Sequence, residues 1–195
     1  MRTAEIERKT TETEVKVKLN IDGSGKYSVK CGIGFLEHML SLFAKQGLFD
    51  LEGEAKGDLN VDEHHLTEDI GIVVGSAFKK ALGEKKGIRR YGFFLLPMDE
   101  SLASAAVDLS GRYAFAYNVK FEREKIGNLP TELIEDFFGA FAQNCQMNLH
   151  LNLDYGRNEH HKAEALFKAF GKSMRMACEM DERLAGALAS TKGVL

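Results

Sequence analysis

Two copies of one short motif, His-His-x-x-Glu, carry the residues of this sequence that are best suited to metal chemistry. The copies occupy residues 64–68 and 160–164, and together they hold four of the six histidines in 195 residues. On a helix, each glutamate lies one turn from both histidines, so its carboxylate can share a cation with either imidazole. Adjacent histidines diverge by about 100° around the helix axis, so each suits a different metal ion. The alternative interpretation is a polar helix start whose histidines are solvated or cap the helix.

A histidine and an aspartate occupy matching places upstream of the two motifs. His38 precedes the first motif by one predicted helix and one predicted strand, and Asp136 holds the equivalent place before the second. The set is imidazole and carboxylate without thiolate, which suits Mn, Fe, Zn or Ni and disfavours a structural zinc site of the ribbon type. The candidate metal ligands are His38, His64, His65, Glu68, Asp136, His160, His161 and Glu164.

Four helices with apolar residues at helical spacing are predicted to position these ligands. The first spans residues 35–47, and the second begins after the candidate N-cap Asp62 and ends at Gly83. Thr131 and Asn158 are predicted to cap the third and fourth helices. Three of the four predicted helix starts therefore have a residue that can accept a backbone hydrogen bond.

Alternating apolar and polar residues predict the strands. In each half, the first two predicted strands are expected to pair as a hairpin, because a Gly-containing turn joins them. The sixth histidine, His150, lies in the last predicted strand and is interpreted as structural. The predicted strands are residues 14–22, 27–31, 49–55, 102–108, 113–121 and 147–153.

The order of these elements indicates an internal duplication, because each half runs hairpin, helix, strand, helix. A charged stretch at residues 83–87 separates the halves, which we place at 1–86 and 87–195 within one compact unit. Helices and strands do not alternate regularly, so an α+β fold is favoured over a doubly wound sheet.

Composition excludes several classes of protein. The net charge of −3 with mixed signs gives no nucleic-acid footprint, and no apolar run is long enough to span a membrane. The N-terminal residues lack the apolar core of a signal peptide. Three cysteines far apart suit free thiols in a reducing compartment. We therefore expect a cytoplasmic protein that binds neither nucleic acid nor membrane.

Short segments spread along the whole chain match the motifs of one enzyme family. They are Glu12-Thr13 and residues 34–40, 47–51, 64–69, 87–92, 97–100, 107–112, 156–161 and 190–195. In this order they resemble the imidazoleglycerol-phosphate dehydratase family of histidine biosynthesis. Two positions depart from many members of that family: Asp136 stands where they have His, and Ser41-Leu42 stands where they have Asp-Gln.

The resemblance implies a fold, an assembly and a reaction. Two similar halves would bundle their helices between two sheets, and the chains would form a 24-subunit homo-oligomer with active sites at subunit contacts. Two manganese ions per active site, or other divalent ions, would hold the substrate ring as an imidazolate and stabilise its negative charge. The reaction would dehydrate D-erythro-imidazole glycerol phosphate, a small-molecule phosphate, to imidazole acetol phosphate.

The resemblance also assigns roles to single residues. Glu12 would be the general acid or base, Asp99 would lie near the reacting hydroxyls, and Glu164 would be a ligand or a proton carrier. Taken alone, Glu12 would be interpreted as a solvated carboxylate and Asp99 as a turn residue. The candidate phosphate-binding residues are Arg90, Arg112, Lys168, Ser190 and Lys192.

Two other functions would use the same ligands. A dinuclear metallohydrolase would activate water against a phosphate ester and release phosphate from several substrates. A non-catalytic assembly protein would use the ions only to join subunits, so it would assemble with metal but turn nothing over.

Overall fold

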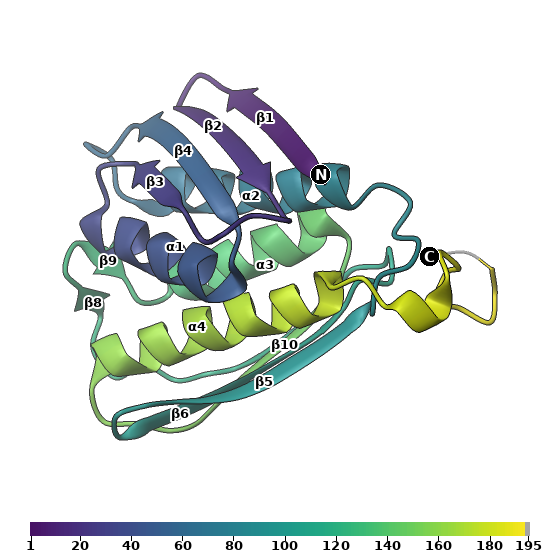
Figure 1. The fold of residues 1–195 in the computed structure, drawn as a ribbon. Helices are drawn as coiled ribbons and strands as arrows, with labels where there is room; N and C mark the ends of the chain where they lie inside the picture. The colour runs from purple at the N-terminus through teal and green to yellow at the C-terminus, as the bar shows by residue number, and fades with distance from the viewer. Residues whose placement is uncertain (194–195) are drawn as a thin grey trace.

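The computed structural model describes residues 1–193 as two four-stranded sheets with four α-helices between them (Figure 1). Helices α1 and α2 pack on the first sheet, α4 packs on the second, and the pairs α1–α4 and α2–α3 join the two layers. The predicted α+β class with helices between two sheets is confirmed. The elements are β1 (Thr3–Lys9), β2 (Thr13–Asn20), β3 (Tyr27–Lys30), α1 (Gly34–Gly47), β4 (Asp50–Gly57), α2 (His64–Leu82), β5 (Tyr91–Met98), β6 (Ser101–Asp108), β7 (Ala114–Asn118), β8 (Lys125–Ile126), β9 (Leu129–Pro130), α3 (Leu133–Cys145), β10 (Asn148–Tyr155), α4 (Glu159–Cys178) and a 3₁₀ turn (Glu182–Leu184).

The two large sheets have the same topology. Their strand orders are β1-β2-β4-β3 and β5-β6-β10-β7, and in each the last strand runs parallel to its neighbour while the other pairs are antiparallel. Each half contains one antiparallel hairpin, which is β1–β2 in the first half and β5–β6 in the second. The predicted pairing of strand 14–22 with 27–31, and of 102–108 with 113–121, is wrong.

The cause of this error is the return of the chain through a helix. After β3, the chain runs through α1 and comes back as β4, which occupies the place beside β2 and leaves β3 at the sheet edge. Strand periodicity shows that a strand exists but does not identify its partner. The true hairpin partners were missed because β1 is a largely charged edge strand and β5 is an almost continuous apolar run.

The centre of the helix layer is a cluster of four phenylalanines, one from each helix. Phe43, Phe78, Phe141 and Phe170 are at most 2% exposed, and the Phe43 and Phe170 rings stack with centroids 5.1 Å apart. The Phe78–Phe141 and Phe141–Phe170 centroids are 5.4 Å and 4.9 Å apart. Such aromatic pairs contribute about 0.5–1.5 kcal/mol each beyond the burial of their area. This cluster joins the two halves of the chain through one core.

Glycines allow the helices to approach closely where the two halves meet. A Cβ on Gly75 of α2 would lie 2.4 Å from the carbonyl oxygen of Phe141, and one on Gly171 of α4 would lie 2.7 Å from that of Phe43. Any larger residue would push α2 from α3, or α4 from α1. These two helix contacts bring the ligands of one half to those of the other.

The helix boundaries were predicted with mixed success. The ends at Gly47 and Gly83 are confirmed, and the Asn158 side chain caps α4 by accepting the N–H groups of His160 and His161. The Thr131 cap is wrong, because its hydroxyl donates to the Arg123 carbonyl instead. Asp62 lies one residue before the N-cap of α2 but still accepts the His64 N–H at 2.8 Å. Among residues 1–193, no helix has the length and apolar character needed to cross a membrane.

Candidate active site

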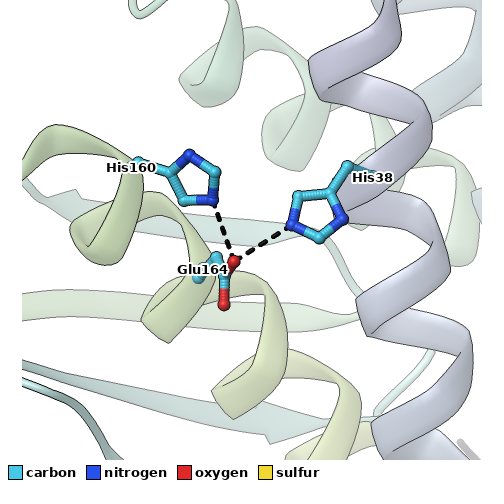
Figure 2. A group of neighbouring side chains, drawn as sticks. All are labelled: His38, His160 and Glu164. Carbon is cyan, nitrogen blue, oxygen red and sulfur yellow. Dashed lines mark hydrogen bonds and ion pairs between the residues drawn. The ribbon is translucent and has the colours of Figure 1, made fainter.

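His38, His160 and Glu164 meet where α1 lies against the start of α4 (Figure 2). The Nε2 atoms of His38 and His160 lie 3.0 Å and 2.9 Å from one oxygen of Glu164, Oε1. Both histidine side chains are 44% exposed, whereas Glu164 is 9% exposed, so the site opens to solvent from a buried carboxylate. Two imidazole nitrogens and a carboxylate oxygen that converge in this way can hold a divalent cation.

The charge of Glu164 is secured by its surroundings. Burial raises the pKa of this carboxyl, but hydrogen bonds from Lys168, His38 and His160 outweigh burial and lower its pKa to about 2. Glu164 is therefore a carboxylate throughout the neutral range, which suits a metal ligand better than a proton carrier. Lys168 contacts Glu164 Oε2 and lies 3.2 Å from Met98 Sδ, so the structure places it at the ligand cluster rather than with the other predicted phosphate residues.

The matching ligands form a looser cluster where α2 meets α3. His64 Nδ1 lies 3.8 Å from Asp136 Oδ2, and both side chains are nearly half exposed. Glu68 is exposed on α2, one turn after His64. Asp136 occupies the place of His38 in the other half. The structure thus pairs each ligand upstream of a motif with the motif of the opposite half.

The second histidine of each motif points away from the first. The ring planes of His64 and His65 are 89° apart, and those of His160 and His161 are 81° apart. The two rings of each pair also contact different carboxylates, Asp136 and Asp58 for His64 and His65, and Glu164 and Glu100 for His160 and His161, in agreement with their predicted divergence.

Each second histidine lies beside carboxylates at a turn or strand end. His65 Nδ1 is 3.0 Å from Asp58 Oδ2 and 3.8 Å from Glu12 Oε2. His161 Nδ1 is 2.7 Å from Glu100 Oε2, and its Nε2 is 3.7 Å from Asp99 Oδ2. The hydrogen bonds to Asp58 and Glu100 raise the pKa of His65 and His161 respectively.

Asp58 and Glu100 were missed as site residues by sequence reasoning. Asp58 directly follows β4, and Glu100 follows Asp99 in the β5–β6 turn, so both stand where turn residues are common. The one feature of the sequence that pointed to Glu100 is its place in residues 97–100, a segment that matches a family motif. Glu12 and Asp99, which were predicted, lie at the β1–β2 and β5–β6 turns and are mostly exposed.

A pocket of about 450 Å³ gathers four of the five predicted phosphate residues. Arg90 is only 9% exposed: its guanidinium binds both oxygens of Asp108, at 2.6 Å and 3.0 Å, and donates to the Ala189 carbonyl at 2.7 Å. Arg90 therefore anchors the segment that brings the C-terminal residues to this pocket. Val194 and Leu195, which end the last predicted motif, lie outside the described residues. The lining residues are Arg90, Tyr91, Arg112, Ala189, Ser190, Thr191 and Lys192.

Comparison with known proteins gives one consistent result. The profile of the imidazoleglycerol-phosphate dehydratase family matches residues 31–174. Imidazoleglycerol-phosphate dehydratases of Pelobacter propionicus and Caldanaerobacter subterraneus are 56% and 54% identical to this chain; both matches cover 100% of it, and 99% and 100% of the relatives.

Solved structures agree with the sequence comparison. The imidazoleglycerol-phosphate dehydratase of Staphylococcus aureus has a TM-score of 0.83 and 38% identity over 92% of this chain and 99% of its own. A Pyrococcus furiosus structure described as IGPD in complex with (S)-C348 also has a TM-score of 0.83, with 33% identity over 97% of this chain and 100% of its own. On this evidence and the site's geometry, the chain belongs to the imidazoleglycerol-phosphate dehydratase family, the hydro-lyases of histidine biosynthesis.

Proposed function

We propose that this chain dehydrates D-erythro-imidazole glycerol phosphate to imidazole acetol phosphate with two manganese ions per active site. The observation that carries the proposal is the convergence of His38 and His160, from opposite halves, on the ionised carboxylate of Glu164. Cation ligands of mixed imidazole and carboxylate character suit manganese, although other divalent ions can use them.

The residues fit two cations rather than one. His38, His160 and Glu164 would hold one ion, and His64, Glu68 and Asp136 would hold another, while His65 and His161 extend from each motif toward ions shared with a neighbouring chain. When bound, the cations supply positive charge that stabilises negative charge developing on the substrate's imidazole ring.

The proton transfers fall to the residues at the two hairpin turns. The C–H bond on the carbon that becomes the ketone breaks, and Glu12 takes the proton. The C–O bond on the carbon attached to the ring breaks near Asp99, and the departing hydroxide takes up the proton that Glu12 removed and leaves as water, which returns Glu12 to its carboxylate form. The resulting enol then becomes the ketone product, so no redox cofactor is required. Glu12 and Asp99 suit these roles because both are exposed beside a ligand histidine.

The phosphate group of the substrate fits the pocket between Arg112 and Lys192. Both side chains are exposed there, and a guanidinium and an ammonium can bind phosphate oxygens by charge-assisted hydrogen bonds. Arg90 contributes indirectly, because its guanidinium is already shared between Asp108 and Ala189.

We expect Arg112→Ala and Lys192→Ala each to raise KM for imidazole glycerol phosphate by roughly 10- to 100-fold. Each change removes one charged hydrogen bond, which contributes about 1.5–3 kcal/mol. Steady-state kinetics measures the effect, with Lys30→Ala on the exposed face of β3 as the control. A wild-type KM in both variants would remove these residues from the phosphate site.

A direct assay tests the proposed function. Purified protein loaded with Mn²⁺ should form the ketone from imidazole glycerol phosphate, and protein treated with a chelator should not. Release of inorganic phosphate instead of ketone would support the hydrolase alternative. Metal-dependent assembly with neither product would support the purely structural one.

We also infer a cytoplasmic homo-oligomer of 24 subunits with active sites at subunit contacts. One chain offers each ion few ligands, and the second histidine of each motif is left to face another chain. The outer face of β5 carries Tyr91, Phe93 and Leu95, which are 54%, 70% and 56% exposed, whereas the outer face of the first sheet is charged. Cys31, Cys145 and Cys178 are buried free thiols, which fits a reducing compartment.

Chelation should therefore shrink the particle toward small oligomers such as trimers, because ions that join subunits would be lost. Light scattering with and without chelator measures this, and restored Mn²⁺ should reverse it. A particle of the same mass in both conditions would contradict metal-dependent contacts, and a monomer in both would contradict assembly altogether.

A further inference from the structure

Each half of the chain supplies a carboxylate that faces the Nδ1 atom of the second motif histidine. Asp58 Oδ2 lies 3.0 Å from His65 Nδ1, and Glu100 Oε2 lies 2.7 Å from His161 Nδ1. Neither carboxylate belongs to the ligand clusters of His38 and His64 described above. The same contact thus occurs twice, at the two histidines that face away from those clusters.

The two contacts come from positions that the internal repeat does not relate. Asp58 lies six residues before His64, but Asp154, which lies six residues before His160, is exposed on β10. In the second half the contact comes instead from Glu100, in the β5–β6 turn. Duplication of the sequence alone therefore does not account for the contact at both histidines.

The contact determines which nitrogen of each imidazole is free. A neutral imidazole has one N–H donor and one nitrogen lone pair. A carboxylate only accepts, so Nδ1 of His65 and of His161 must carry the hydrogen and donate it. The lone pair is then on Nε2, and the ring is held in one orientation. A carboxylate behind a metal-binding histidine acts in this way and makes the imidazole a stronger ligand.

Glu100 is held more firmly than Asp58. Its other oxygen, Oε1, accepts the backbone N–H of Asn158 at 2.7 Å and of Arg157 at 3.2 Å. The β5–β6 turn is thereby tied to the start of α4, the helix that carries His161. Within the described residues, the second oxygen of Asp58 is buried without a hydrogen-bond partner. Substitution of Asp58 is therefore easier to interpret, because its side chain contacts His65 but, unlike that of Glu100, accepts no backbone N–H group from residues 1–193.

We propose that Asp58 and Glu100 are positioning residues that present Nε2 of His65 and His161 to divalent cations. The proposal rests on the proposed function for the identity of the cation, and it deepens that function by adding two residues to the site. It concerns the orientation and tautomer of the two rings, so it can be tested without turnover.

The first test uses full-length, metal-free protein labelled with ¹⁵N-histidine. Magic-angle-spinning NMR at alkaline pH should show His65 and His161 with hydrogen on Nδ1, with signals assigned by loss in His65→Gln and His161→Gln. Asp58→Ala should convert only His65 to a mixture of tautomers. Asp58→Asn should restore the wild-type tautomer, because its amide oxygen still accepts from Nδ1. A wild-type protein with hydrogen on Nε2 at both histidines would overturn the proposal.

The second test measures the binding of Mn²⁺ by electron paramagnetic resonance of the free ion. Asp58→Ala and Glu100→Ala should each weaken binding at one class of site by about 10- to 100-fold. Asp154→Ala is the matched control and should bind as wild type does. Unchanged affinity in Asp58→Ala would overturn the proposal, even if Glu100→Ala were lost through misfolding.

These outcomes are distinct from a failure of the proposed function. Protein that shows the expected tautomers and the weaker Mn²⁺ binding, yet forms no ketone, would support the positioning role and contradict the dehydratase reaction. An Asp58→Ala protein that forms ketone at the wild-type rate and binds Mn²⁺ normally would support the dehydratase reaction and contradict the positioning role.

Discussion

The double variant His64→Ala, His160→Ala should lose both manganese ions, about two per chain in the wild type, and all measurable ketone formation. His160 belongs to the cluster with Glu164, and His64 belongs to the cluster with Asp136. The double variant therefore removes one imidazole ligand from each of the two clusters. Elemental analysis of protein purified with Mn²⁺ measures the ion content, and a ketone assay measures turnover.

The sixth histidine provides the control for this experiment. His150 is exposed on β10, opposite Ala106 and Ala116 in the register, so His150→Ala should retain metal and activity. Each single variant should lose about half of the metal, because His64 and His160 belong to different clusters. Full metal content in the double variant would show that these clusters are not the metal sites.

Glu12→Gln should lower turnover by about 10²- to 10⁴-fold, the usual contribution of a positioned acid or base. The amide has nearly the same shape as the carboxyl, but it cannot take a proton from the substrate. Glu12 is exposed at the β1–β2 turn and is not one of the predicted metal ligands, so the variant should keep its fold, metal and particle size. Single-turnover kinetics on metal-loaded protein isolates the chemical step.

A neighbouring carboxylate gives the matched control. Glu14 is exposed on β2 and pairs with Lys9 at 2.8 Å, so Glu14→Gln should turn over as wild type does. Normal turnover in Glu12→Gln would leave the dehydratase reaction in place and move the base to Asp99. Glu164 is a weaker substitute, because Lys168 and two histidines hold its pKa near 2 and it therefore stays ionised.

Local patterns in the sequence determined which residues could carry the chemistry. Spacing of four along a helix places Glu164 one turn from His160, and adjacency forces the rings of His160 and His161 apart; both features appear in the structure. Helix α1 and the cap of α4 were likewise predictable, because apolar periodicity and capping depend on residues within a few positions of each other.

Tertiary structure alone decided which of these residues meet. No local pattern shows that β4 returns between β2 and β3, because strand periodicity carries no information about the partner. For the same reason, the meeting of His38 with His160 followed only from the packing of α1 on α4.

The positioning of other side chains also depended on distant segments. Arg90 could have bound phosphate, but Asp108 and the Ala189 carbonyl lie where they occupy its guanidinium. In the sequence, Glu100 has the features of an ordinary turn residue. Its contact with His161 exists only because the β5–β6 turn packs against the start of α4. The sequence by itself determined the donor atoms and their local spacing. Their grouping into sites required contacts across more than 100 residues, such as that of His38 with Glu164, which only the packed helices and sheets specify.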